Sequence, residues 1–292
     1  MTKTIDSHDL VKFDGRGVRP HGDVIAPLAF ITPQERKPSF QSQAYTGGVP
    51  RYDFAMEDHS VRIADLRPNA DRFSLDRQGF AFRTAPTRVA DLWDDEAVAG
   101  PYTEETKRLL RRELGAEEVF VFDITRRSDD GSGATNPDGR RGPATRIHVD
   151  YTESSGPRRV RDVVGYANFD RLIAAGARVV QVNLWRPIAG PVARAPLALA
   201  DASTVRPESL IATDQIFPDR VGEIYHLTHD PAQRWYYAPA MTRDELLLIK
   251  GWDSLKDGRA RFTPHSAFTL PNQDPAAPAR QSIEVRAFVV IR

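Results

Sequence analysis

The heptapeptide Arg146-Ile147-His148-Val149-Asp150-Tyr151-Thr152 places an imidazole and a carboxylate two residues apart within a β-branched, strand-like run. Residues two apart on a strand point to the same face. His148 and Asp150 can therefore bind one metal ion side by side. They would supply two of the three ligands of a 2-His-1-carboxylate facial triad, which holds non-haem Fe(II) and leaves positions open for O2 and an organic ligand.

The third ligand must come from elsewhere, and His265 in Thr263-Pro264-His265-Ser266-Ala267-Phe268 is the best candidate. Fifteen residues later, Arg280-Gln281-Ser282 opens the last predicted strand of the chain. Arg280 and Ser282 share one face of that strand and suit a carboxylate ligand. An isolated H-x-D occurs often by chance. The order H-x-D, long gap, His, short gap, R-x-S is much more specific and predicts an iron site.

Composition limits the class of protein. The chain has 292 residues, of which 40% are hydrophobic and 27% charged, as is typical of a globular protein. Lys plus Arg and Asp plus Glu both number 40, so the net charge is zero and gives no support for nucleic acid or a membrane as partner. Cysteine is absent, which excludes disulfides and thiolate metal sites. Because no segment has the apolar character of a membrane span or signal peptide, we expect a cytoplasmic protein.

Two regions are expected along the chain. Residues 1–50 are rich in Pro, Gly and polar residues and predict a partly irregular N-terminal arm. Residues 51–292 predict a single domain that is mainly β with flanking helices, and the clearest helix covers residues 103–115. The polar, Gly-rich stretch 126–146 predicts a long surface loop, either a lid over the site or a tolerated insertion.

Two of the predicted strands carry rows of polar side chains. In the strand over residues 178–188, Gln181, Asn183 and Trp185 fall on one face, opposite an apolar face. In the last strand, polar side chains again share one face: Arg280, Ser282, Glu284 and Arg286. Since buried polar groups need partners, both rows predict the lining of a cavity. Lys250, at the end of an apolar strand, either binds a carboxylate in this site or reaches the surface.

Several motifs occur in the order found in one enzyme family. They are H-V-D-Y-T, N-x-W-R-P-I, P-L-A-L-x-D, W-Y-Y-x-P-x-M, L-L-L-I-K-x-W-D-S, P-H-S-A-F and R-x-S-I-E-V-R, and they cover roughly residues 50 to 292. In these blocks the chain resembles the fungal and bacterial hydroxylase/desaturase family, which includes aspergillic acid hydroxylase, a gibberellin GA4 desaturase and CmcJ-like proteins. The resemblance implies a double-stranded β-helix, or jelly-roll, core.

The resemblance also implies a function. It implies an Fe(II)/2-oxoglutarate-dependent dioxygenase that hydroxylates or desaturates a small molecule of secondary metabolism through ferryl-mediated C–H abstraction, with O2 as oxidant. His148, Asp150 and His265 would bind the iron. Arg280 with Ser282 would bind the distal carboxylate of 2-oxoglutarate, and Arg286 is a second candidate for it. A substrate pocket is expected from the same blocks and from the residue after the H-x-D: Asn183, Trp185, Arg186, Lys250 and Tyr151.

Two alternatives stay open at this point. One is a non-haem iron oxidase that needs no 2-oxoglutarate and uses the arginine to hold a carboxylate-bearing substrate such as an amino acid. The other is a non-catalytic metal-binding jelly-roll protein. Succinate formed in step with product would distinguish the first prediction from both. The sequence leaves the substrate, the oligomeric state and the choice between hydroxylation, desaturation and ring closure undetermined.

Overall fold

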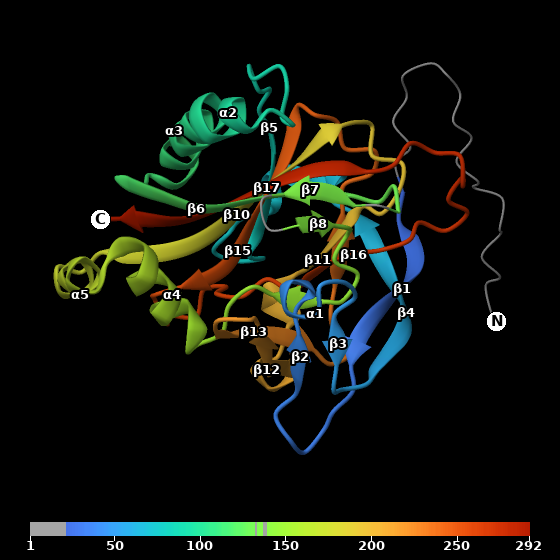
Figure 1. Cartoon of the computed structure of the whole chain (residues 1–292), viewed down its shortest axis with the longest axis horizontal. Helices are drawn as coiled ribbons and strands as arrows, with labels where there is room; N and C mark the ends of the chain where they lie inside the picture. Colours follow the sequence, from blue (N-terminus) through green and yellow to red (C-terminus); the bar gives the residue numbers. More distant parts are fainter. Residues whose placement is uncertain (1–21, 132, 137–138) are drawn as a thin grey trace.

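Two large sheets dominate the structure, a computed structural model that describes residues 22–292 except 132 and 137–138 (Figure 1). The strands of the first sheet, in spatial order, are β1 (Val24–Ile31), β4 (Met56–Asp65), β14 (Trp235–Tyr237), β11 (Leu197–Ala200), β16 (His265–Ala267), β9 (His148–Val149), β13 (Val221–Leu227), β12 (Leu210–Ile216), β2 (Ser39–Gln41) and β3 (Arg51–Tyr52). Those of the second are β5 (Phe80–Thr84), β15 (Glu245–Asp253), β10 (Arg178–Ala189), β17 (Gln281–Ile291) and β6 (Glu118–Ser128).

Short helices flank the sheets, so the predicted mainly β fold with flanking helices is confirmed. The α-helices are α1 (Gln43–Thr46), α2 (Asp95–Ala97), α3 (Thr103–Leu114), α4 (Ser155–Val164) and α5 (Tyr166–Ala174). The other helical turns are η1 (Arg67–Arg72), η2 (Val98–Tyr102), η3 (Ala202–Thr204) and η4 (Pro207–Ser209). Across the part of the chain that the structure describes, every helix is too short or too polar to span a bilayer.

The five-stranded sheet has an apolar outer face and a largely polar inner face. Polar and apolar residues alternate along both β10 and β17, and the pairing of the two strands places residues of the same type side by side. Val182 pairs with Ala287 on the outer face, where Leu109 and Leu110 of α3 pack against the sheet. Each such leucine stabilises the fold by about 1.5–3 kcal/mol when fully buried. Asn183 pairs with Arg286 one residue along and therefore points to the opposite, inner face. Figure 1 shows α2 and α3 on one side of this sheet and the ten-stranded sheet on the other.

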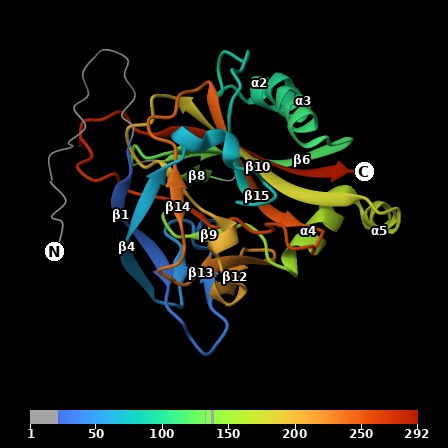
Figure 2. The same ribbon diagram turned by 180° about the vertical axis from the view of Figure 1, so that it is seen from behind.

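The two sheets face each other across this polar inner surface, as in a jelly roll. Asp150, which directly follows β9 of the ten-stranded sheet, receives hydrogen bonds from Asn183 on β10 and Arg286 on β17. Helices α4 and α5 cover one end of the assembly, as seen from behind in Figure 2, and pack Val160 and Leu172 against Phe288 of β17. The Asp150 side chain thus points from the ten-stranded sheet into the space between the sheets.

The N-terminal region contributes to the ten-stranded sheet. Residues 1–21 of the expected arm lie outside the described residues, whereas β1 pairs with β4 over eight residues and β2 pairs with β12. Strand β3, which pairs with β2, carries Tyr52, whose hydroxyl accepts a hydrogen bond from the Arg146 guanidinium at 2.5 Å, two residues before His148. The stretch expected as a loop over 126–146 also contains more regular structure, since β6 continues to Ser128 and two short strands follow, β7 (Ala134–Asn136) and β8 (Gly139–Arg141).

Candidate metal centre

His148, Asp150 and His265 lie together between the sheets. His148 on β9 is the cross-strand partner of His265 on β16, and their ring centroids are 4.5 Å apart. Asp150 follows two residues later on the same side, with its Oδ1 atom 3.7 Å from His148 Nε2. One potential ligand atom from each residue lies within 4.8 Å of the other two. The structure therefore brings together the three residues that the sequence selected from positions far apart.

Both imidazoles are oriented by backbone carbonyls. His148 Nδ1 lies 2.9 Å from the Arg146 carbonyl oxygen, and His265 Nδ1 lies 3.0 Å from that of Thr263. Because a carbonyl oxygen only accepts, each Nδ1 must carry the proton, which leaves the Nε2 lone pair free for a metal. Burial, reinforced by the neighbouring His265, lowers the pKa of His148 to about 3, so this imidazole is neutral at physiological pH.

The Asp150 carboxylate is held by one of its two oxygens. Oδ2 accepts hydrogen bonds from Asn183 Nδ2 at 2.7 Å and from Arg286 Nε at 2.9 Å. Burial alone would raise the pKa of Asp150, but the charge of Arg286, helped by the Asn183 hydrogen bond, holds it well below the usual range. Oδ1 is left for a ligand. Two neutral imidazoles and one carboxylate are the donor set that Fe(II) takes in a facial triad, so these residues fit that metal.

Arg286 lies at the centre of a carboxylate network. Besides Asp150, its guanidinium donates to Glu284 Oε2 at 2.6 Å and to Asp123 Oδ2 at 2.6 Å. Asn183 also donates to Glu284 Oε1, at 2.9 Å. The structure therefore does not support Arg286 as a second candidate for the 2-oxoglutarate carboxylate. Its donors are already used by three acidic side chains, one of which is Asp150.

Arg280, in contrast, is a buried cation with few partners. Its side chain is 2% exposed, donates one hydrogen bond to the Ala195 carbonyl at 2.8 Å and lies over the Trp185 ring. Its buried Nε has no partner, and within the described residues no carboxylate forms an ion pair with it. Burial, and then the nearby Arg127, lower the pKa of Arg280 to about 9. A buried guanidinium in this state is a strong binding site for a carboxylate.

The other predicted pocket residues divide into two groups. Asn183 and Trp185 lie on the inner face as predicted, and Ser282 shares the strand face of Arg280. Tyr151 is next to Asp150, whose charge, together with burial as the larger cause, raises the pKa of the phenol above its usual range. Of these residues, Asn183 and Tyr151 lie directly beside Asp150.

Arg186 and Lys250 lie outside this group, which corrects the prediction for both. Arg186 follows Trp185 on β10 and points to the outer face, where it donates to Tyr102 and to two backbone carbonyls. Lys250 pairs with Val182 and is fully buried among acidic side chains on that same face. The alternation of β10 places Arg186 outside. β15 is buried on both faces, so its sequence has no polar alternation that would reveal the direction of Lys250.

Three residues near the centre were not selected from the sequence. His226 on β13 is the cross-strand neighbour of His148, is buried, and has Nδ1 3.0 Å from Thr213 Oγ1. Thr125 and Arg127 on β6 point to the inner face opposite Glu284 and Ser282. The alternation Asp123-Ile124-Thr125-Arg126-Arg127 is the signal that indicates this inner face.

Comparison with known proteins agrees with the geometry. A family described as "Oxidoreductase/YMDC permease-like domain" matches residues 28–290. The hydroxylase/desaturase efuI of Hormonema carpetanum is 34% identical over 250 residues, which are 78% of this chain and 82% of efuI. The Fe(II)/2-oxoglutarate-dependent dioxygenase nvfI of Aspergillus novofumigatus is 30% identical over 250 residues, 83% of this chain and 87% of nvfI. The chain belongs to the hydroxylase/desaturase family.

A solved structure supports the same conclusion. The iron and alpha-ketoglutarate-dependent endoperoxidase NvfI superimposes with a TM-score of 0.81 and 27% identity, covering 92% of this chain and 98% of NvfI. The predicted family, jelly-roll fold and enzyme class are thereby confirmed, as are the predicted cofactors Fe(II), 2-oxoglutarate and O2.

Proposed function

We propose that this hydroxylase/desaturase binds Fe(II) through His148 Nε2, Asp150 Oδ1 and His265 Nε2, and hydroxylates or desaturates a small-molecule secondary metabolite. The observation that carries the proposal is the orientation of the three groups. Each side chain has its second polar atom held by the protein, and the remaining ligand atoms converge within 4.8 Å. Together, bound iron, 2-oxoglutarate and O2 supply the oxidising power needed to remove hydrogen from a C–H bond.

Arg280 is proposed to bind the distal carboxylate of 2-oxoglutarate. Its support is the buried guanidinium, with an Nε atom that lacks a partner and no acidic side chain of the described residues paired with it. A planar guanidinium binds a carboxylate with two parallel hydrogen bonds, which fixes direction as well as affinity. Ser282 lies on the same strand face, two residues away, and would donate a further hydrogen bond.

Asn183 and Arg286 are proposed to hold the Asp150 carboxylate in one rotamer. Because both donate to Oδ2, rotation of the carboxylate would break two charge-assisted hydrogen bonds of about 1.5–3 kcal/mol each. This keeps Oδ1 directed at the metal throughout turnover. The aromatic rings of Tyr151 and Phe288 lie beside this carboxylate on the α4 side, with their centroids 6.2 Å apart.

Succinate formation tests this function against the alternatives. Anaerobically purified protein is loaded with Fe(II), supplied with 2-oxoglutarate and O2, and assayed for succinate with and without small-molecule candidates. We expect iron-dependent succinate formation that a true substrate accelerates. His265→Ala should abolish it. His229→Ala is the matched control, because His229 stacks on His59 away from the three proposed ligands. Substrate oxidation without succinate would instead establish the 2-oxoglutarate-independent oxidase.

A further inference from the structure

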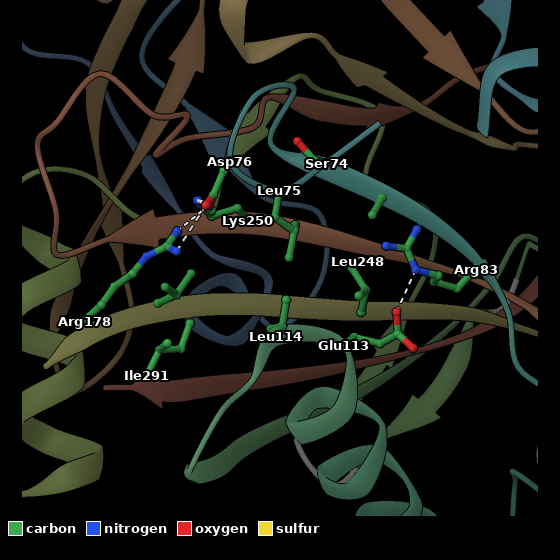
Figure 3. Close-up of a pocket in the computed structure, with 12 residues that line it drawn as sticks. Ser74, Leu75, Asp76, Arg83, Glu113, Leu114, Arg178, Leu248, Lys250 and Ile291 are labelled. Atoms are coloured by element: carbon green, nitrogen blue, oxygen red, sulfur yellow. Dashed lines mark hydrogen bonds and ion pairs between the residues drawn. The ribbon is translucent and has the colours of Figure 1, made fainter. Parts of the chain in front are cut away.

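A buried ionic cluster lies on the outer face of the five-stranded sheet, away from the metal centre. Figure 3 shows Lys250, Arg178 and Asp76 converging at one end of a surface pocket. Lys250 Nζ donates to Asp76 Oδ1 at 2.9 Å and to Asp253 Oδ2 at 2.8 Å. Lys250 and Asp253 are completely buried, whereas the Asp76 side chain is half exposed. These interactions connect strand β15 to the turn that contains Asp76.

The same cluster also connects residues 260–263 to β15 and to the turn that contains Asp76. Lys250 Nζ makes its third hydrogen bond to the Ala260 carbonyl at 2.9 Å, and the Ala260 N–H donates to the Asp76 carbonyl at 2.8 Å. The Lys250 N–H donates to the Gly79 carbonyl at 2.8 Å. The ammonium group thus has all three donors satisfied by groups that link β15, the turn 76–79 and the segment 260–263.

Thr263 connects this arrangement to the metal centre. Its hydroxyl donates to the Gly79 carbonyl at 2.8 Å, and its own carbonyl accepts the Nδ1–H of His265 at 3.0 Å. Gly79 has φ of +84°, and a Cβ atom there would lie 2.1 Å from Thr263 Oγ1. Only glycine therefore allows both the turn and the close approach of Thr263. The Gly79 carbonyl thus accepts from both the Lys250 N–H and the Thr263 hydroxyl, and the backbone of Thr263 continues the connection to the imidazole of His265.

We propose that Asp76, Lys250 and Thr263 are positioning residues for the metal centre, which set the orientation of His265 through Gly79 and the Thr263 carbonyl. The inference rests on the proposed role of His265 as an iron ligand. The segment 254–264 has no regular structure. Apart from this set of hydrogen bonds, here called the clamp, it is held near His265 by the Ala200 N–H, which donates to the Pro264 carbonyl at 2.9 Å, and by Arg261, which donates to the Asp253 carbonyl. The clamp is the part of this support that acts on Thr263, whose carbonyl fixes the His265 tautomer and ring orientation. Groups that orient a ligating histidine typically change metal affinity by about 10- to 100-fold when removed.

The test replaces Thr263 by valine, which keeps the shape and the backbone carbonyl but removes the hydroxyl. Co(II) is titrated anaerobically into the apoprotein, and its visible absorption reports both affinity and ligand geometry. We expect Thr263→Val to weaken Co(II) binding about 10-fold and to change the Co(II) spectrum. Thr263→Ser, which retains the hydrogen bond to Gly79, should restore both. Asp76→Asn, which keeps the shape of this half-exposed side chain but removes its charge, should weaken Co(II) binding about 3-fold.

Glu245→Gln is the matched control, because Glu245 forms a buried ion pair with Arg67 at the other end of β15. It should lower the melting temperature of the apoprotein and leave the Co(II) affinity and spectrum unchanged. Unchanged Co(II) binding in both Thr263→Val and Asp76→Asn would overturn the clamp while leaving the proposed metal site intact. Stoichiometric Co(II) binding with an unchanged spectrum in His265→Ala would overturn the proposed site, and the clamp with it.

Discussion

Replacement of Arg280 by methionine separates the binding of the cosubstrate from the stability of the fold. The guanidinium is 2% exposed and makes one hydrogen bond, to the Ala195 carbonyl. If it holds the distal carboxylate of 2-oxoglutarate, its removal costs one bidentate, charge-assisted interaction. Hydrogen bonds to charged groups contribute about 1.5–3 kcal/mol each, so a loss of about 3 kcal/mol predicts a dissociation constant raised about 100-fold. Arg280→Lys, which replaces the planar guanidinium by a compact ammonium charge, should lower the affinity for 2-oxoglutarate about 10-fold.

The same substitution should stabilise the protein in the absence of 2-oxoglutarate. Burial, with Arg127 as the next cause, lowers the pKa of Arg280 to about 9 from an ordinary value of 12.5, so the folded protein disfavours the charge. Replacing a poorly compensated buried charge by an apolar side chain of similar size is stabilising by about 1–4 kcal/mol. After subtraction of about 1 kcal/mol for the lost Ala195 hydrogen bond, we expect a gain of about 0–3 kcal/mol, and for its midpoint a melting temperature about 3 °C higher.

Arg186→Met is the control for this experiment. Arg186 is equally buried, but its donors satisfy the Tyr102 hydroxyl and the carbonyls of Arg243 and Ala85 on the outer face. Its removal leaves these buried acceptors without a donor and should destabilise the protein by about 3 kcal/mol without changing the affinity for 2-oxoglutarate. Thermal unfolding of the apoprotein and anaerobic titration with 2-oxoglutarate measure the two quantities. The reasoning is refuted if Arg280→Met destabilises like Arg186→Met and binds 2-oxoglutarate normally.

Three further predictions concern the metal ligands and the fold. Asn183→Leu should weaken Fe(II) binding about 10-fold, because it removes one of the two hydrogen bonds that hold Asp150 Oδ2; competition with a chelator measures the affinity, and equal affinities would contradict the proposed role of Asn183. Fe(II) at 100 times its dissociation constant should raise the free energy of unfolding by about 2.7 kcal/mol in the wild type and by almost nothing in His148→Ala. Burial raises the pKa of Glu223, but hydrogen bonds led by that from Lys37 outweigh it and lower the pKa to about 2. Since the folded pKa lies below the usual 4.5, this stabilisation is complete above pH 4.5 and is lost as the pH falls towards 2. Urea unfolding should therefore show the stability difference between wild type and Glu223→Gln shrinking by about 1 kcal/mol between pH 6 and pH 3, a figure discounted for solvent screening; a constant difference would argue against the ionised Glu223.

The pairing of His148 with Asp150 was predictable from the sequence because its signal is local, whereas His265 was selected through the order of the motifs along the chain. H-x-D on a β-branched run fixes two ligands on one strand face, and the alternation of the last strand separates Arg280, Ser282, Glu284 and Arg286 from apolar residues. The alternation does not show which polar residue of a row binds which partner. Arg286 and Arg280 look alike in sequence, and only the structure shows that three carboxylates already bind Arg286.

The features that the sequence did not predict are those that depend on packing between residues far apart in the chain. Lys250 lies in a strand that is buried on both faces, so no polar pattern marks its direction, and its partner Asp76 is distant in sequence. The pairing of β1 with β4 and of β2 with β12 is equally non-local, which is why the arm gave little sign that it would join the sheet. The positions of Thr263 and Gly79 relative to His265 follow from the same long-range contacts.

The most direct test of the central claim is an anaerobic titration of the apoprotein with Fe(II) and then 2-oxoglutarate, monitored by visible absorption. A chelated keto acid on Fe(II) gives a weak charge-transfer band. We predict a band that saturates at one equivalent of iron, is absent in His148→Ala and His265→Ala, and requires about 100-fold more 2-oxoglutarate in Arg280→Met. Iron bound tightly with no such band, or a band unchanged in the two histidine variants, would contradict the account.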